Sequence, residues 1–347
     1  MRILHLYRPR LPSLRAQAIQ VLHTTHALAR RGHQVRVLAD RGGEGGVEEA
    51  LAPFGLEAPP GLELELAPTA WPPGAGLWFR SRLWAWCREP GVVYARAKRY
   101  IRLIPARIPV VIESHELDSA LDREAGRDPA PAERLEREVL RRCSALVTNC
   151  EGTLALWEQH HGPHLPALRR VIHNATRQDR QVLRQPSAEI RVLYTGSPRD
   201  YKGLQKVFDS LPLWPAGVRL VLVGGTPAGT PAQVEVQPGV DYQKLPAVLA
   251  TAHALLLPLE DNLFGRRLTS PLKLWDYLAT GIPIVAADLP TVRAIAGELP
   301  CYYQPQDAAS IAAAVVCAQT IGETPRRLRF WEDRAAEVEQ VLAEIPR

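Results

Sequence analysis

Residues 269–290 constrain the fold most, because a helix and a buried strand follow each other there with one glycine between them. Apolar side chains recur at helical spacing up to Leu278, and Gly281 then supplies the left-handed residue at which helices commonly end. The next run, residues 284–287, is short and wholly apolar, which is typical of a strand buried on both faces of a parallel sheet. A helix followed at once by such a strand predicts an α/β fold.

The turn before this helix predicts a site for an anion. Thr269 or Ser270 can cap the helix, and Pro271 suits its first turn, where the missing N–H has no helical partner to lose. The N-terminus of a helix offers free N–H groups and a partial positive charge, which favour a phosphate group. Asp276 follows in the same helix, where its carboxylate can accept hydrogen bonds from sugar hydroxyls.

Residues 270–278, SPLKLWDYL, closely resemble the nucleotide-sugar signature of retaining GT-B glycosyltransferases, the large family-4-like group that includes sucrose synthases and mannosyltransferases. The resemblance implies two Rossmann-like doubly wound domains that face each other across a cleft. It also implies that the amides of the turn hold the diphosphate of the donor, and that Asp276, where the family has a glutamate, holds the ribose. The turn residues concerned are Thr269, Ser270, Pro271, Leu272 and Lys273. The family's other glutamate, eight residues earlier, is replaced here by Leu268.

A second group of expected donor contacts follows another strand. Residues 190–196 read as a strand that runs into a loop, and Lys202 lies six residues after Gly196. The family has a glycine and a lysine at this spacing, so the resemblance implies that Lys202 acts as a point charge on the leaving diphosphate. Ser197 stands where the family commonly has an arginine, and Arg199 would be its weaker substitute.

The N-terminal part of the chain predicts a βαβ unit, with strands at residues 2–7 and 34–39 and a helix at residues 15–31 between them. In doubly wound folds, ligands bind at the carboxyl ends of such strands. Arg15, at the start of the helix, is therefore a candidate contact for an anion. The competing interpretation is a solvated arginine in the first helical turn.

An apolar strand at residues 110–112 ends abruptly in four polar residues, as a site at the carboxyl end of a strand requires. The segment resembles the strand that delivers a histidine to the transferred sugar in the family. The resemblance thus implies that His115 bonds a donor hydroxyl and that Glu113 or Glu116 faces the acceptor or the reacting centre. A histidine that merely caps a neighbouring helix is the competing interpretation.

Residues 77–107 hold eight Lys or Arg residues against one acid, Glu89, with Trp and Phe side chains interleaved. Basic residues mixed with aromatics favour an interface with anionic lipid or with a lipid-phosphate acceptor. The competing interpretation is a helix whose tryptophans belong to the core. The residues concerned are Arg80, Arg82, Arg88, Arg96, Lys98, Arg99, Arg102 and Arg107, with Trp78, Phe79, Trp84 and Trp86.

Composition excludes several classes of function. Five cysteines are scattered without a CxxC pair, which predicts neither a zinc site nor a disulfide framework and fits a reducing compartment. The net charge of +5 is too diffuse to indicate nucleic acid as a partner. No apolar run reaches about 18 residues, and the N-terminus has no signal-peptide pattern, so we expect a cytoplasmic protein that is peripheral at most at the inner face of the membrane. The high content of Arg, Ala, Leu and Pro is typical of a GC-rich bacterial genome.

These features together predict three parts: an acceptor-side domain at residues 1–175, a nucleotide-sugar domain at 189–325, and a C-terminal helix at 326–347 that returns to the first domain. The expected activity is metal-independent, cofactor-free hexosyl transfer with retention. It moves a sugar from a nucleoside diphosphate sugar, of UDP or GDP type, to an acceptor hydroxyl on a glycan, a lipid-linked sugar or a small molecule, in polysaccharide, glycolipid or natural-product glycosylation. Two alternatives stay open: an epimerase or phosphorylase of the same fold, and a non-catalytic nucleotide-binding protein, to which Leu268 points.

Overall fold

The computed structural model describes all residues except 14, 42–45, 68–74, 186–188, 198–202 and 346–347. The chain divides into two compact units. Unit 1 comprises Met1–His173 and Trp331–Arg347, and unit 2 comprises Asn174–Phe330. The chain therefore leaves unit 1 once, forms unit 2, and returns to unit 1 with its last helix.

Unit 1 is built on a sheet in which every described strand pair is parallel. Its order is β2-β3-β1-β5-β6-β7-β8, with β4 also paired to β3. The order reverses between β1 and β5, and in doubly wound sheets such a switch point is where ligands bind. The strands are β1 (Arg2–Leu6), β2 (Arg10–Leu11), β3 (Gln34–Arg41), β4 (Leu62–Leu66), β5 (Val92–Ala95), β6 (Val110–Ser114), β7 (Ala145–Thr148) and β8 (Leu168–Val171).

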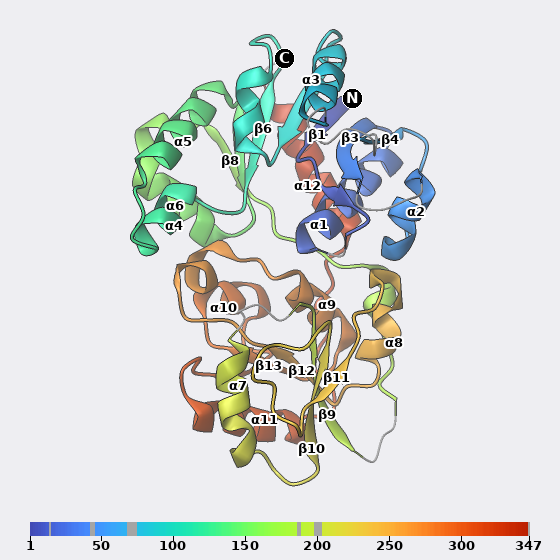
Figure 1. The fold of residues 1–347 in the computed structure, drawn as a ribbon, viewed down its shortest axis with the longest axis vertical. Coiled ribbons are helices and arrows are strands. Elements are labelled where there is room, and N and C mark those ends of the chain that lie inside the picture. The colour runs from blue at the N-terminus through green and yellow to red at the C-terminus, as the bar shows by residue number, and fades with distance from the viewer. Residues whose placement is uncertain (14, 42–45, 68–74, 186–188, 198–202, 346–347) are drawn as a thin grey trace. The chain divides into compact units, whose positions relative to one another are not determined.

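Most helices of unit 1 lie between successive strands in the chain, as parallel pairing requires a crossover between neighbours. The helices are α1 (Ala16–Arg30), α2 (Val47–Leu51), α3 (Ala75–Trp86), α4 (Asp118–Glu124), α5 (Ala130–Arg142), α6 (Glu151–His161) and α12 (Trp331–Glu344). The last of these comes from the far end of the chain, yet it packs against α1, as the red and blue helices in Figure 1 show.

Unit 2 is a second doubly wound sheet, again parallel in every described pair. Its order is β11-β10-β9-β12-β13-β14, so the switch point lies between β9 and β12. The strands are β9 (Ile190–Thr195), β10 (Val218–Val223), β11 (Glu235–Gln237), β12 (Ala254–Leu257), β13 (Ile284–Ala287) and β14 (Cys301–Tyr303). The helices are α7 (Leu204–Ser210), α8 (Leu245–Leu249), α9 (Leu272–Thr280), α10 (Pro290–Ala296) and α11 (Ala308–Thr320).

The middle strands of both sheets form the cores. Every residue of β5, β6, β7, β12 and β13 is buried, which agrees with strands covered by helices on both faces. The predicted helix, glycine break and strand at 269–290 is confirmed as α9, Gly281 with a φ of +76°, and β13.

Two details of the prediction were wrong. The N-cap of α9 is Pro271, with no capping bond from a side chain, because the Ser270 hydroxyl instead accepts a bond from the backbone N–H of Asn174. Two cysteines also form a disulfide, Cys301–Cys317, although their spacing gave no sign of one. The packing of α11 on β14 brings the pair together across a sequence separation of 16 residues.

Candidate functional site

The switch point of unit 2 presents bare backbone at the end of β9. Gly196 directly follows the strand, is exposed and has a φ of +115°, a conformation that other residues rarely adopt. Gly224, after β10, has a φ of +126°, and a Cβ atom there would lie 2.7 Å from the carbonyl oxygen of Gly196. The two glycines therefore let the chain segments that follow β9 and β10 approach each other closely.

The Lys273 side chain of α9 reaches this same end of β9. Its Nζ lies 3.7 Å from the centroid of the Tyr194 ring. A Cβ atom added to Gly196 would lie 3.4 Å from the same nitrogen. The Tyr194 hydroxyl donates to the carbonyl of Ser197, which ties Ser197 to the end of the strand. Tyr277, one turn further along α9, holds helix and strand together through hydrogen bonds to the backbone N–H and the hydroxyl of Thr195. An ammonium group from the first turn of α9 thus lies beside Gly196.

Asp276 is 2 % exposed and lies in a buried polar cluster of unit 2. Its Oδ1 accepts hydrogen bonds from the hydroxyls of Thr176 and Tyr242, at 2.5 and 2.9 Å. The same oxygen lies 3.2 Å from Nε of Arg180, which has no exposed surface. Burial alone would lower the pKa of Arg180, but Asp276, Tyr242 and Asp179 together raise it. The second oxygen, Oδ2, takes no part in these three bonds.

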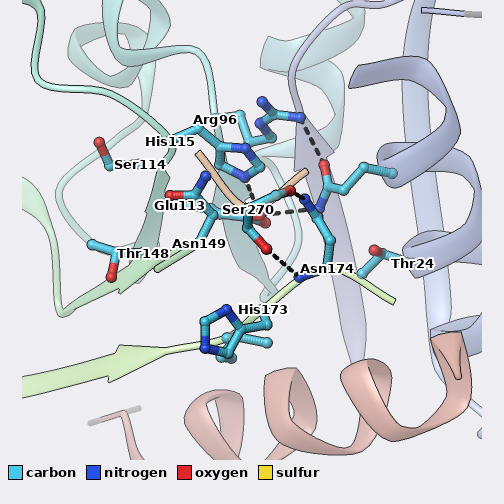
Figure 2. A network of polar contacts seen from close by, with 12 residues as sticks. Thr24, Arg96, Glu113, Ser114, His115, Thr148, Asn149, His173, Asn174 and Ser270 are labelled. Carbon is cyan, nitrogen blue, oxygen red and sulfur yellow. Dashed lines mark hydrogen bonds and ion pairs between the residues drawn. The ribbon is translucent and has the colours of Figure 1, made fainter. Parts of the chain in front are cut away.

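The other predicted residues of unit 2 are placed as follows. Thr269 and Ser270 are buried, and the Ser270 carbonyl accepts a bond from the Asn174 side chain at 2.6 Å (Figure 2). Pro271 is buried and Leu272 is half-buried, so the first turn of α9 is not a fully open surface. Lys202 and Arg199 lie outside the described residues.

In unit 1, a buried polar network lies beneath the carboxyl end of β6. Oε1 of Glu113 accepts three bonds: from Arg334 Nη2 at 2.5 Å, Gln20 Nε2 at 3.0 Å and His115 Nε2 at 2.6 Å. Gln20 in turn accepts a bond of 2.7 Å from Arg96. Figure 2 shows Glu113, His115 and Arg96 turned toward one another at the strand end. Glu113 is 1 % exposed, so it supports the site from beneath and does not itself face an acceptor.

The charges of this network differ from those of the free side chains. Burial alone would raise the pKa of Glu113, but Arg334, His115 and Arg96 together hold it well below its usual value. Burial and the Arg96 charge lower the pKa of His115 to about 4, against a weaker opposite effect of Glu113. At neutral pH the network therefore contains a carboxylate and an uncharged imidazole.

The switch point of unit 1 gathers further charged groups around Tyr7. The Arg96 guanidinium lies 4.8 Å from the ring centroid of Tyr7, and Arg15 and Glu116 are both near enough to influence the Tyr7 hydroxyl. Arg15 and Glu116 are exposed, as candidate ligand contacts must be, and the pKa of Tyr7 is raised mainly by burial. Among the described residues, no three His, Cys, Asp or Glu side chains gather in a way that could hold a metal ion.

Sequence reasoning missed two residues of the unit 1 network. Arg96 stands out in the sequence only as one of the basic residues of 77–107. Its position directly after β5, at the switch point of the sheet, nevertheless indicates a residue near a ligand site. Arg334 had no such signal, because it lies 221 residues from Glu113 on a helix with ordinary amphipathic spacing.

The basic and aromatic stretch is divided between core and surface. Phe79 and Trp86 are buried, as the core interpretation expects, whereas Trp84 is 61 % and Leu77 65 % exposed. The guanidinium of Arg88 lies 3.9 Å from the Trp84 ring. None of the described helices is both long and apolar enough to span a bilayer.

Comparisons with known proteins place this geometry in a family. Residues 17–180 match the family described as Glycosyltransferase Family 4, and residues 189–319 match Glycosyl transferases group 1. A search of curated proteins found no match.

Solved structures match the whole chain. Sucrose-phosphate synthase from Thermosynechococcus elongatus aligns with a TM-score of 0.76 at 16 % identity, covering 99 % of this chain and 98 % of that one. HepE from Anabaena, in complex with UDP and glucose, aligns with a TM-score of 0.70 at 16 % identity over 99 % and 100 % of the two chains. WaaG, a glycosyltransferase involved in lipopolysaccharide biosynthesis, gives 0.65 at 16 % over 98 % and 95 %. With two family matches in chain order and two doubly wound sheets, the chain belongs to the family-4-like glycosyltransferases of the GT-B fold.

Proposed function

We propose that this protein transfers a hexose from a nucleoside diphosphate sugar to an acceptor hydroxyl, with retention of configuration and without a metal ion or other cofactor. The observation that carries the proposal is the convergence at the switch point of unit 2. There the ammonium group of Lys273, from the first turn of α9, lies beside the exposed Gly196. A diphosphate leaving group develops negative charge, and a fixed cation with free backbone N–H groups stabilises that charge.

The roles of the residues follow from this placement. Lys273 and the turn at residues 269–272 would neutralise the diphosphate, with Gly196 and Ser197 lining its other side. Lys202 and Arg199, which lie outside the described residues, are kept as the diphosphate contacts that the family resemblance implies. Oδ2 of Asp276 would contact the ribose. His115, with Arg15 and Glu116 nearby, would contact the sugar and the acceptor. No side chain is assigned as a covalent nucleophile. Retention then agrees best with an acceptor hydroxyl that attacks the sugar from the same face as the one from which the diphosphate leaves.

UDP is the first nucleotide to test, because the HepE structure, which is similar to this chain, contains UDP and glucose. The experiment is thermal unfolding with a panel of nucleoside diphosphates, with and without magnesium. A nucleotide at 100 times its dissociation constant adds about 2.7 kcal/mol to stability. A shift with UDP or GDP that does not need magnesium supports the proposal.

Other outcomes favour other functions. Stabilisation by a nucleotide without sugar transfer to any hydroxyl acceptor would point to a binding protein, which the buried Leu268 in place of a glutamate favours. Donor turnover without an acceptor, or turnover that depends on phosphate, would indicate an epimerase or a phosphorylase. No shift with any nucleotide would overturn the proposed donor site.

We also propose that unit 1 contacts anionic membrane lipid at the cytoplasmic face, where a lipid-linked acceptor would lie. Leu77, Arg80, Trp84 and Arg88 are all exposed and follow one another at intervals of three and four residues, so they share one side of α3 and its continuation. Exposed apolar side chains between arginines suit the interface of an anionic bilayer.

A further inference from the structure

We propose that Arg334 and Glu113 are positioning residues that present His115 to the substrate as a hydrogen-bond acceptor for a hydroxyl group. The inference deepens the proposed function, because it states which kind of group His115 can recognise. All the contacts that carry it lie within unit 1.

Arg334 cannot itself bind a substrate, because each guanidinium nitrogen already has a protein partner. Nε donates to the Thr24 hydroxyl at 3.0 Å, and Nη1 donates to the carbonyls of Ile172 and His173 at 2.8 and 2.9 Å. Nη2 donates to Glu113 at 2.5 Å. With no exposed surface, Arg334 acts only through these partners, and Glu113 is the one that carries charge.

Glu113 is thereby restricted to accepting hydrogen bonds. Arg334 can only donate, and Gln20 presents its amide N–H to Glu113 because its carbonyl oxygen accepts from Arg96. A buried carboxylate with a bound guanidinium stays ionised, since a proton on it would leave the arginine charge without compensation.

The tautomer of His115 follows from this restriction. Nε2 lies 2.6 Å from the carboxylate oxygen, so Nε2 must carry the hydrogen. An uncharged ring then has no hydrogen on Nδ1, and the lowered pKa of His115, about 4, keeps the ring uncharged at neutral pH. Figure 2 shows the single bond from the ring to Glu113, and 18 % of the side chain stays exposed. Nδ1 is therefore an acceptor.

An acceptor at this position selects its partner. A sugar hydroxyl can donate to Nδ1, whereas a phosphate or carboxylate oxygen would meet a lone pair and be disfavoured. The C-terminal helix α12 thus determines, through Arg334, which chemical groups the end of β6 accepts.

The test is nitrogen-15 NMR of the histidine side chains in the ligand-free full chain, with His115 assigned by its loss in His115→Gln. We expect His115 to be an uncharged Nε2–H tautomer that does not titrate between pH 5.5 and 8. An imidazolium at pH 7, or hydrogen on Nδ1, would overturn the inference.

Variants separate positioning from simple support of the fold. Arg334→Leu removes the guanidinium bound to Glu113, so the carboxylate acts more strongly on His115 and should raise the pKa of His115 by about two units, into the range from pH 5.5 to 8. Arg334→Lys retains the charge and should keep His115 from titrating there. Glu113→Gln, which has nearly the same shape, should produce a mixture of tautomers and no such rise.

A structural defect would have a different signature, because a disordered His115 would titrate near its ordinary pKa of about 6.5 in both Arg334→Leu and Glu113→Gln. That result would reject the positioning role. Glu339→Gln is the matched control, since Glu339 also joins α12 to the body of unit 1, through His33 at 2.8 Å and Arg31, but lies outside the network. It should leave the His115 spectrum unchanged.

The failure of this inference is distinguishable from failure of the proposed function. If UDP gives no thermal shift while the spectrum shows the Nε2–H tautomer, the donor proposal fails and the positioning of His115 stands. If UDP binds while His115 is charged or protonated on Nδ1, only the positioning inference fails.

Discussion

His5, in the middle of β1, is completely buried, and within the described part of the chain neither of its ring nitrogens has a hydrogen-bond partner. Burial lowers its pKa to about 3. The unfolded chain, with a histidine pKa of about 6.5, then binds more protons than the folded one between these values, so stability falls as the pH decreases below about 6.5.

We predict that His5→Leu removes this loss. At pH 5 the free energy of unfolding should rise by about 2 kcal/mol through the titration alone, and at pH 8 that contribution should vanish. Urea unfolding at both values measures the difference. His164→Leu, at an exposed histidine of the same unit, is the control, and a gain for His5→Leu that is equal at both pH values would contradict the mechanism.

Asp276 gives a second prediction for a single residue. Asp276→Asn should lower the stability of unit 2 by about 3 kcal/mol, because the fully buried Arg180 keeps its charge and loses its counter-ion. In the double variant Asp276→Asn/Arg180→Leu, the combined loss should be smaller than the sum of the two single losses, as chemical denaturation can show. Additive losses would mean that the two side chains are not coupled.

The sequence predicts local features of these residues better than their surroundings. The glycine at the end of α9 and the strand after it follow from neighbouring residues, and both are confirmed. The burial of Asp276 could not be foreseen, because its partners Thr176, Tyr242 and Arg180 lie 100, 34 and 96 residues away. The expectation that Glu113 or Glu116 faces the acceptor or the reacting centre also left Glu113 open as a substrate contact, since nothing near it in the sequence indicates Arg334.

The disulfide Cys301–Cys317 joins β14 to α11 and closes a loop in the chain, with a sequence separation of 16 residues. Closing a loop of that length lowers the entropy of the unfolded chain and stabilises the fold by roughly 3 kcal/mol. We predict that Cys317→Ser lowers the free energy of unfolding of unit 2 by about that amount. Thiol titration of the denatured protein should find three free cysteines, in agreement with Cys87, Cys143 and Cys150. Five free thiols, and no loss of stability in Cys317→Ser, would show that the bond is absent in solution.

Helix α3 gives the other prediction at this scale. Trp84→Ser should reduce binding to vesicles that contain phosphatidylglycerol by about tenfold, because an exposed tryptophan contributes buried apolar area at the lipid interface. Cosedimentation measures the effect. Leu213→Ser, at a residue of unit 2 that is 55 % exposed, serves as the control, and equal losses in both variants would indicate non-specific adsorption.

On the scale of the whole molecule, the two units should respond separately to perturbation. Arg334→Leu removes the counter-ion of a buried carboxylate and should lower the free energy of unfolding of unit 1 by roughly 3–5 kcal/mol. The free energy of unfolding of unit 2 should stay unchanged. Hydrogen exchange resolved by peptide can follow both units at once. Equal loss of protection in α11 and in α1 would contradict independent units.

The return of the chain to unit 1 has a consequence for synthesis on the ribosome. Everything from Asn174 to Phe330 must emerge before Arg334 does, so Glu113 spends that interval without its guanidinium partner. Translation at about 5–20 residues per second makes the delay roughly ten to thirty seconds. Unit 2 is a continuous segment that can fold in this time, whereas unit 1 is completed only after translation has passed through its neighbour.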